Sequence, residues 1–305
     1  ITWDYVRAEI WEDSGRVIFF PAFTATEVRV DITANYISCG ELIDTINELD
    51  EPELSDDEND IKFESLINNS PLKKDRIQNT DLIFVRELTG GIYFGKRGRK
   101  DNGNFAYDTC EYNRYEVERI AQLGFEMALK RKRKLCCVDK ANVLESSRLW
   151  RETVQNMESR FPDVKVSYEF VDAVAMRLIQ WPSKYDVLVT SNLFGDILTD
   201  EASVISGSMG LMPSASIGAK NALYEPIHGS YPQAAGKNIA NPVGSILSLA
   251  MMFEHSFNLE KESNIIKQAV ENSLKEKITT QDISGNDKTY STSDVGDFIC
   301  NYINS

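Results

Sequence analysis

Histidine, basic residues and long apolar runs are all scarce in this chain of 305 residues. Two histidines, His228 and His255, are too few for a histidine-rich metal site. No run of 18 apolar residues occurs, so we expect no membrane span. Lys and Arg number 33 against 47 Asp and Glu, and the net charge of −14 argues against nucleic-acid binding. An anionic substrate would therefore need a local basic site.

Paired cysteines and nucleotide motifs are missing as well. The five cysteines include no CxxC pair, which predicts reduced thiols in a cytoplasmic protein rather than a disulfide or zinc framework. The chain contains no GxGxxG after a strand, no GxxxxGKS or GxxxxGKT and no GxSxG. A standard Rossmann fold, a P-loop and a hydrolase elbow are therefore unsupported.

From Ser70 onward, short apolar runs alternate with apolar stripes of helical period, which predicts an α/β fold. Strands are expected at 81–86, 134–138, 165–170 and 185–190, and helices at 115–130, 144–161, 173–179, 197–206, 242–253 and 265–274. The first 70 residues predict short strands at 16–20 and 27–32, a helix at 39–49 and a solvated acidic loop at 51–64.

Two aspartates follow the strand expected at 185–190. Asp196 and Asp200 are four residues apart, so they share one face of a helix that begins where α/β proteins bind ligands. A cation between them would offset their repulsion, and oxygen ligands suit Mg²⁺ or Mn²⁺. The alternative is a solvated helix start. Asp172 follows another strand and is either a helix N-cap or a third carboxylate of the same site.

Three further side chains have two interpretations each. Lys140, directly after a strand, is a general base if burial lowers its pKa, and otherwise an exposed lysine. Tyr112 is either an acid or a packing residue. Arg86 ends a buried strand and requires an anionic partner, which is an internal carboxylate or a substrate carboxylate. The Gly-, Pro- and Asn-rich segment 225–242 predicts a long loop before a helix, whose N–H groups could bind phosphates.

A resemblance to the 3-isopropylmalate dehydrogenases of leucine biosynthesis, which are β-decarboxylating dehydrogenases, extends from Ser70 to the C-terminus. It is carried by the Asp172 region and by RELTGGIYFG (86–95), AYDTCEY (106–112), VDKANVLESSRLWRE (138–152), VLVTSNLFGDILTDEAS (187–203), EPIHGSYPQAAGKNIANP (225–242) and STSDVGDFI (291–299). The resemblance implies a two-domain isopropylmalate/isocitrate dehydrogenase-like α/β fold. Residues 72–207 would form the central dimerisation domain, and residues 1–71 plus 208–305 the cofactor-side domain.

The resemblance also implies the reaction, which is NAD-dependent oxidative decarboxylation of the dicarboxylate 3-isopropylmalate to 2-oxoisocaproate, with Mg²⁺ or Mn²⁺. Tyr112 would be the acid, Lys140 the base, and Arg86 and Asp172 would bind substrate. The implied metal ligands are Asp172, Asp196 and Asp200. The implied cofactor residues are Asn142, Glu225, His228, Gly229, Ser230, Gln233 and Asn241. Equivalents of Lys140 and Asp172 come from the partner subunit, which implies a homodimer with shared active sites.

The chain departs from the family pattern in two places. Residues 1–70 lack the family's GDGIGPE and LRP segments, and Gln233 stands where NAD-dependent relatives usually have aspartate. NAD⁺ remains the expected cofactor because the Lys-Tyr pair of NADP⁺-dependent relatives is absent. Two alternatives stay open, a non-catalytic binding or regulatory relative with a replaced N-terminal segment, and a dehydrogenase of a related 2-hydroxy acid such as malate or tartrate.

Overall fold

The computed structural model describes residues 70–218, 221–285 and 287–305, together with four short strands near the N-terminus. These strands form two antiparallel pairs, β1 (Glu9–Trp11) with β2 (Arg16–Ile18), and β3 (Arg29–Val30) with β4 (Ile37–Ser38). The strands predicted at 16–20 and 27–32 correspond to β2 and β3. The helix predicted at 39–49 and the acidic loop at 51–64 lie outside the described residues.

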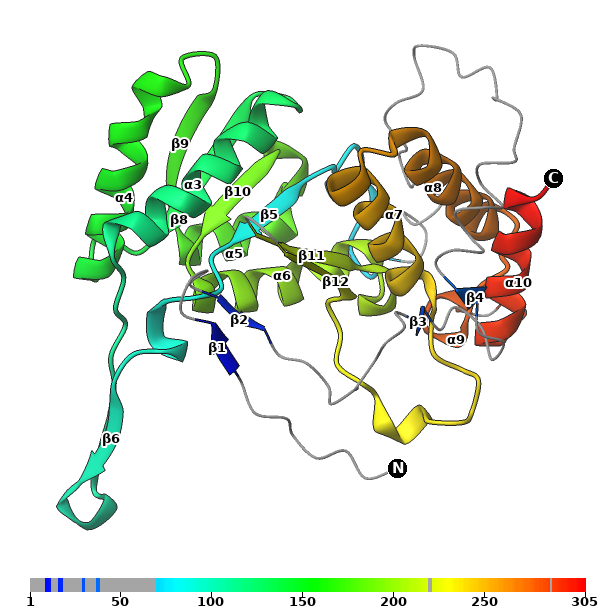
Figure 1. Cartoon of the computed structure of the whole chain (residues 1–305), viewed down its shortest axis with the longest axis horizontal. Helices are drawn as coiled ribbons and strands as arrows, with labels where there is room; N and C mark the ends of the chain where they lie inside the picture. The colour runs from blue at the N-terminus through cyan, green and yellow to red at the C-terminus, as the bar shows by residue number, and fades with distance from the viewer. Residues whose placement is uncertain are drawn as a thin grey trace. The chain divides into compact units, whose positions relative to one another are not determined.

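The chain divides into two compact units, both drawn in Figure 1. One contains Leu72–Ile205 and the other contains Ser206–Ser305. The predicted assignment of residues 1–71 to the cofactor-side domain stays a prediction, because most of that segment lies outside the described residues.

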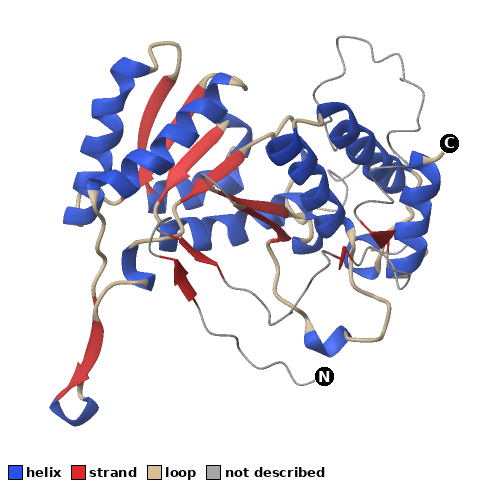
Figure 2. Cartoon of the chain, in the orientation of Figure 1, coloured by secondary structure: helices blue, strands red, loops and turns tan. Residues whose placement is uncertain are grey.

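A parallel four-stranded sheet forms the centre of the first unit (Figure 2). Its strand order is β5 (Ile83–Arg86), β10 (Val187–Thr190), β8 (Lys134–Asp139) and β9 (Lys165–Phe170). A parallel sheet is covered on both faces, so its strands are nearly continuous apolar runs. The short apolar segments of the sequence correctly predicted β5, β8 and β10, and β9, an edge strand with the sequence KVSYEF, was also predicted although it is not an apolar run.

Alternate side chains of the strands pack against opposite layers of helices. Cys137 and Val189 pack with α3 and α4, whereas Cys136 and Leu188 on the other face pack with α5 and α6. The covering helices are α3 (Arg114–Leu129), α4 (Glu145–Met157), α5 (Val171–Gln180) and α6 (Asn192–Ser206). The α/β fold class is thereby confirmed. One boundary prediction is wrong, since α6 begins at Asn192 rather than at 197, so Asp196 lies inside the helix.

A hairpin that the sequence did not predict projects from the first unit (Figure 1). Its strands are β6 (Arg97–Lys100) and β7 (Phe105–Asp108), and every residue of β7 is exposed. Because neither strand has a buried face, the run lacks the apolar alternation that marks a strand. The remaining short elements of this unit are α2 (Lys74–Ile77), η2 (Gly91–Tyr93), η3 (Asp101–Gly103), η4 (Glu158–Arg160) and η5 (Pro182–Lys184).

Residues 206–305 of the second unit, as far as they are described, form a helical core and the β-hairpin β11–β12. Ile246 and Phe253 of α7 pack against Ile266 and Val270 of α8, which confirms that two helices form in this region. Their predicted bounds are wrong, since α7 ends at Phe257 rather than at 253 and α8 begins at Glu260 rather than at 265. The elements are η6 (Met209–Leu211), β11 (Pro213–Ile217), β12 (Ala222–Pro226), η7 (Pro232–Ala234), α7 (Val243–Phe257), α8 (Glu260–Lys275), α9 (Gln281–Ser284) and α10 (Thr292–Ile303). Within the described ranges, no helix has the length and apolar character needed to cross a membrane.

Candidate functional site

The predicted site residues of the first unit gather at the carboxyl edge of its parallel sheet. Arg86 is the last residue of β5, Lys140 directly follows β8, and Asp172 lies two residues beyond β9. Asp196 and Asp200 lie on α6, which follows β10. This edge is where open α/β sheets place ligands.

The guanidinium of Arg86 is held by the first turn and a half of α6. Its Nε donates to the backbone oxygen of Asn192 at 3.0 Å, and a terminal nitrogen donates to Asn192 Oδ1 at 2.9 Å. The same side chain pairs with Asp196 at 2.9 Å. Gly195 makes room for it, since a Cβ there would lie 2.5 Å from Arg86 Cγ. The internal carboxylate partner is therefore observed, and binding of a substrate carboxylate stays a prediction.

Asp196 has a second partner that the sequence did not reveal. The hydroxyl of Tyr93 donates to Asp196 Oδ2 at 2.9 Å, while Asp196 Oδ1 faces Arg86. The Asp196 side chain is still 46% exposed, and Asp200, one helical turn further, is exposed. Two carboxylates thus share one accessible face of α6, as their spacing predicted.

Tyr112 is both a packing residue and a positioned hydroxyl. Its ring meets Trp150 edge to face at 5.3 Å between centroids. Its hydroxyl oxygen accepts the backbone N–H of Asn192 at 2.9 Å, and burial raises the pKa of this phenol well above its ordinary value. The oxygen lone pair is used by Asn192, so the hydroxyl proton can be directed at a ligand. In this arrangement Tyr112 stays neutral at ordinary pH, and its role as the acid stays a prediction.

Lys140 and Asp172 form an ion pair at the ends of β8 and β9. The hydrogen bond from Lys140 lowers the pKa of the Asp172 carboxyl, and the ammonium lies 5.7 Å from the centroid of the Phe170 ring. The alternative interpretation of Asp172 as an N-cap is wrong, because Phe170 occupies the N-cap position and Asp172 lies in the first turn of α5.

The segment of Lys140 is itself rigidly supported. Asp139, whose side chain is 1% exposed, accepts two hydrogen bonds from Arg151, at 2.7 and 3.0 Å, and one from the N–H of Ala141 at 2.8 Å. A bidentate arginine–carboxylate pair is geometrically specific, so it fixes the backbone on both sides of Lys140. Asn142, predicted to lie near the nicotinamide, is exposed in the turn that follows.

The strand order separates these side chains into two clusters. Arg86, Tyr112 and Asp196 gather around the adjacent strands β5 and β10, whereas Lys140 and Asp172 lie at β8 and β9. Within the described residues, no three His, Cys, Asp or Glu side chains are grouped closely enough to hold a metal ion. The chemistry of the donors, three accessible carboxylates, fits Mg²⁺ or Mn²⁺. The three-aspartate metal site stays a prediction.

In the second unit, the predicted cofactor residues belong to β12 and to the segment between β12 and α7. Glu225 lies on β12, so the loop predicted at 225–242 begins two residues later than expected. His228 Nδ1 contacts the backbone oxygen of Gly229 at 2.9 Å. Ser230 and Gln233 are exposed, which leaves their polar groups accessible.

The end of this loop is anchored within its own unit. Asn241 donates to Asp282 at 3.0 Å and accepts the N–H of Val243 at 3.0 Å, so its side chain holds the first turn of α7. The side-chain oxygen of Asn238 accepts the N–H of Ser293 at 3.1 Å, at the start of α10. The cofactor roles of these residues stay predictions, but their loop is held in place at its carboxyl end.

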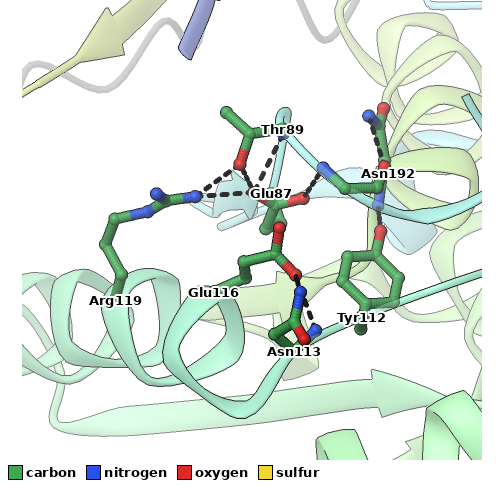
Figure 3. Close-up of polar contacts among 8 residues, drawn as sticks. Glu87, Thr89, Tyr112, Asn113, Glu116, Arg119 and Asn192 are labelled. Carbon is green, nitrogen blue, oxygen red and sulfur yellow. Dashed lines mark hydrogen bonds and ion pairs between the residues drawn. The ribbon is translucent and has the colours of Figure 1, made fainter. Parts of the chain in front are cut away.

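Sequence reasoning missed the residues that hold the first cluster together. Figure 3 shows Glu87, Thr89 and Arg119 in one hydrogen-bonded group beside Tyr112 and Asn192. Glu87 lies next to Arg86 at the end of a buried strand, and a second charge there was the available signal. No sequence signal marked Asn192, because its role depends on contacts with residues at least 80 positions away in the chain.

Comparisons with known proteins show the family of this chain and agree with its α/β fold. The family described as isocitrate/isopropylmalate dehydrogenase matches residues 59–299. A 3-isopropylmalate dehydrogenase of Bacteroides fragilis is 52% identical over 243 residues, which are 79% of this chain and 68% of the relative. One from Aquifex aeolicus is 50% identical over 224 residues, 72% of this chain and 62% of the relative. A crystal structure of isocitrate dehydrogenase from Methylococcus capsulatus matches with a TM-score of 0.70 and 34% identity, covering 74% of this chain and 68% of that one.

Proposed function

Because the chain belongs to the isocitrate/isopropylmalate dehydrogenase family, we propose that it catalyses the NAD-dependent oxidative decarboxylation of 3-isopropylmalate in leucine biosynthesis. The observation that carries the proposal is the cluster around Asn192, where Arg86, Asp196 and the hydroxyl of Tyr112 converge at the ligand-binding edge of the sheet. The curated relatives named above, about half identical to this chain, favour 3-isopropylmalate over other 2-hydroxy acids.

Each polar side chain has a task that suits its surroundings. Arg86, which already binds a carboxylate, would hold a carboxylate of the substrate. Lys140 would accept the proton of the substrate hydroxyl as it is oxidised. Tyr112 would then protonate the enol that remains after loss of carbon dioxide, because burial keeps its hydroxyl protonated.

NAD⁺ and a divalent metal ion would supply the chemistry that the side chains lack. NAD⁺ would accept a hydride, and Mg²⁺ or Mn²⁺ would make the substrate hydroxyl more acidic and stabilise negative charge on the enolate. Asp196 and Asp200 of one subunit and Asp172 of the other would hold the metal ion. Asn142, Glu225, His228, Gly229, Ser230, Gln233 and Asn241 would contact NAD⁺.

We propose a homodimer in which Lys140 and Asp172 serve the site of the partner subunit. Their ion pair supports this, because it allows the base and the third carboxylate to arrive as one unit. The four described cysteines, Cys110, Cys136, Cys137 and Cys300, are free thiols, which supports the proposed cytoplasmic location.

The test is NADH formation with Mn²⁺ and 3-isopropylmalate, with malate and tartrate as competing substrates. We expect turnover with 3-isopropylmalate and a loss of about 10²–10⁴-fold in both Lys140→Met and Tyr112→Phe. The two variants should differ with a substrate deuterated at the transferred carbon, since only Lys140→Met makes hydride transfer rate-limiting. A parent protein without turnover on any of the three acids would favour the non-catalytic relative.

A further inference from the structure

A nearly inaccessible carboxylate next to Arg86 has no task in the proposed reaction. The Glu87 side chain is 1% exposed, and it directly follows β5. It accepts hydrogen bonds from the N–H groups of Thr89 and Gly90, at 2.9 and 2.8 Å, and from Arg119 at 2.9 Å (Figure 3). A buried charge is tolerated only when it is fully paired, so these donors are obligatory.

The hydrogen bonds of Glu87 fix the turn at residues 89–91, which packs against the ring of Tyr112. A Cβ on Gly90 would lie 2.8 Å from the Tyr112 ring, and one on Gly91 would lie 2.4 Å from its hydroxyl oxygen. The backbone of these two glycines is therefore in direct contact with the phenol. Gly91 also donates its N–H to the backbone oxygen of Glu111 at 2.9 Å, which ties the turn to the residue before Tyr112.

The same turn positions the group that holds the hydroxyl. The side-chain nitrogen of Asn192 donates to the backbone oxygen of Gly90 at 3.3 Å, and the backbone N–H of Asn192 donates to the Tyr112 hydroxyl at 2.9 Å. A shift of Gly90 would therefore move both the wall of the ring and the donor to its oxygen.

We propose that Glu87, paired with Arg119, is a positioning residue for the proton transfer carried out by Tyr112. This inference rests on the proposed function of Tyr112, but the geometry on which it depends can be tested separately. A glutamine at position 87 has one oxygen that accepts hydrogen bonds and one nitrogen that donates them. Its nitrogen would face either the Gly90 N–H or the donors of Arg119 and Thr89, so one of these two sets of hydrogen bonds would be lost. The turn should therefore loosen in Glu87→Gln while the fold is retained.

Asp186→Asn is a matched control. Asp186 is also 1% exposed and paired with one arginine, Arg131, at 2.8 Å. It directly precedes β10, whereas Tyr112 contacts the residues that follow β10, so the control lies at the opposite edge of the sheet. Both variants should lower the midpoint of thermal unfolding, because each disrupts a buried ion pair.

The two variants should differ in kinetics. We expect Glu87→Gln to lower kcat about 10- to 100-fold with little change in KM, and Asp186→Asn to leave kcat unchanged. The hydride isotope effect of Glu87→Gln should stay small, as in Tyr112→Phe. In the Tyr112→Phe background, Glu87→Gln should cost less than about twofold, because its effect passes through the missing hydroxyl. A lowered midpoint with unchanged kcat, or effects that multiply, would overturn the proposal.

A readout without turnover separates this inference from the proposed function. 3-Fluorotyrosine placed at position 112 should give a ¹⁹F resonance that shifts or broadens in Glu87→Gln and not in Asp186→Asn. If the parent protein is inactive, the proposed function fails, and the resonance alone decides whether Glu87 positions Tyr112. If Glu87→Gln does not fold, Glu87→Asp replaces it, since the shorter side chain keeps the negative charge but cannot reach Arg119 and the Gly90 N–H together. An unchanged resonance in the variant would refute the positioning role.

Discussion

Replacing Gly91 by alanine tests the placement of Tyr112 most directly. Gly91 has φ of +79°, a left-handed conformation that costs an alanine about 1–2 kcal/mol. The new Cβ would lie 2.4 Å from the Tyr112 hydroxyl oxygen, so that oxygen must move by about 1 Å to reach an ordinary contact. This movement breaks its 2.9 Å hydrogen bond from Asn192, worth about 1 kcal/mol. We expect a loss of about 2–3 kcal/mol in the free energy of unfolding, which combines both costs.

Gly103→Ala is the control, because Gly103 has φ of +93° but no atom within 4 Å of a Cβ. It should lose only the backbone contribution, about 1–2 kcal/mol, in urea denaturation. In steady-state kinetics, Gly91→Ala should lower kcat by about 10²-fold, since a misplacement of 1 Å is that costly, whereas Gly103→Ala should not. Equal losses of stability and equal kcat in the two variants would refute the contact between Gly91 and the phenol.

Three further predictions concern the metal, the cofactor and pH. Asp196→Asn and Asp200→Asn should each weaken Mn²⁺ binding sharply in calorimetry, and unchanged affinity in both would reject these carboxylates as ligands. Gln233→Asp should sharpen the preference for NAD⁺ over NADP⁺ in kcat/KM, because a carboxylate repels the 2′-phosphate; ratios that do not separate would show that residue 233 does not contact the ribose. Burial alone would raise the pKa of Glu169, but hydrogen bonds from Lys184, Arg177 and Tyr185 outweigh it and hold the pKa below its ordinary value near 4.5. Its contribution to stability is therefore present above pH 4.5 and lost as the pH falls through the lowered pKa, so Glu169→Gln should flatten the acid limb of the unfolding curve, and parallel curves would contradict the assignment.

Much of the first unit could be predicted because its signals are local. The apolar segments within 134–138 and 185–190 correctly predicted β8 and β10, since these inner strands of the sheet are buried on both faces. The spacing of Asp196 and Asp200 placed both on one helical face, which follows from the period of the helix alone. The β6–β7 hairpin was missed, because β6 (RGRK) is mostly charged and β7 (FAYD) is a four-residue strand with no buried face.

The partners within the site could not be predicted in the same way. Arg86 required an anion, but only the packing of α6 beside β5 selected Asp196 and supplied Asn192. Glu87 and Arg119 are 32 residues apart, and nothing in their local sequences marks them as a pair. The requirement for glycine at position 91 is apparent only in the folded chain, where the phenol of Tyr112 lies against it.

The sequence by itself determined the alternation of strands and helices, the accessible face of α6 and the family, because each depends on residues close together in the chain or on a motif kept in order. The tertiary structure decided the strand order β5–β10–β8–β9, and with it the separation of Arg86, Tyr112 and Asp196 from Lys140 and Asp172. Strand order is set by how helices on both faces of the sheet bury their apolar sides, which is a property of the whole packed unit. For this reason, residues with equivalent positions at strand ends belong to different clusters in the folded chain.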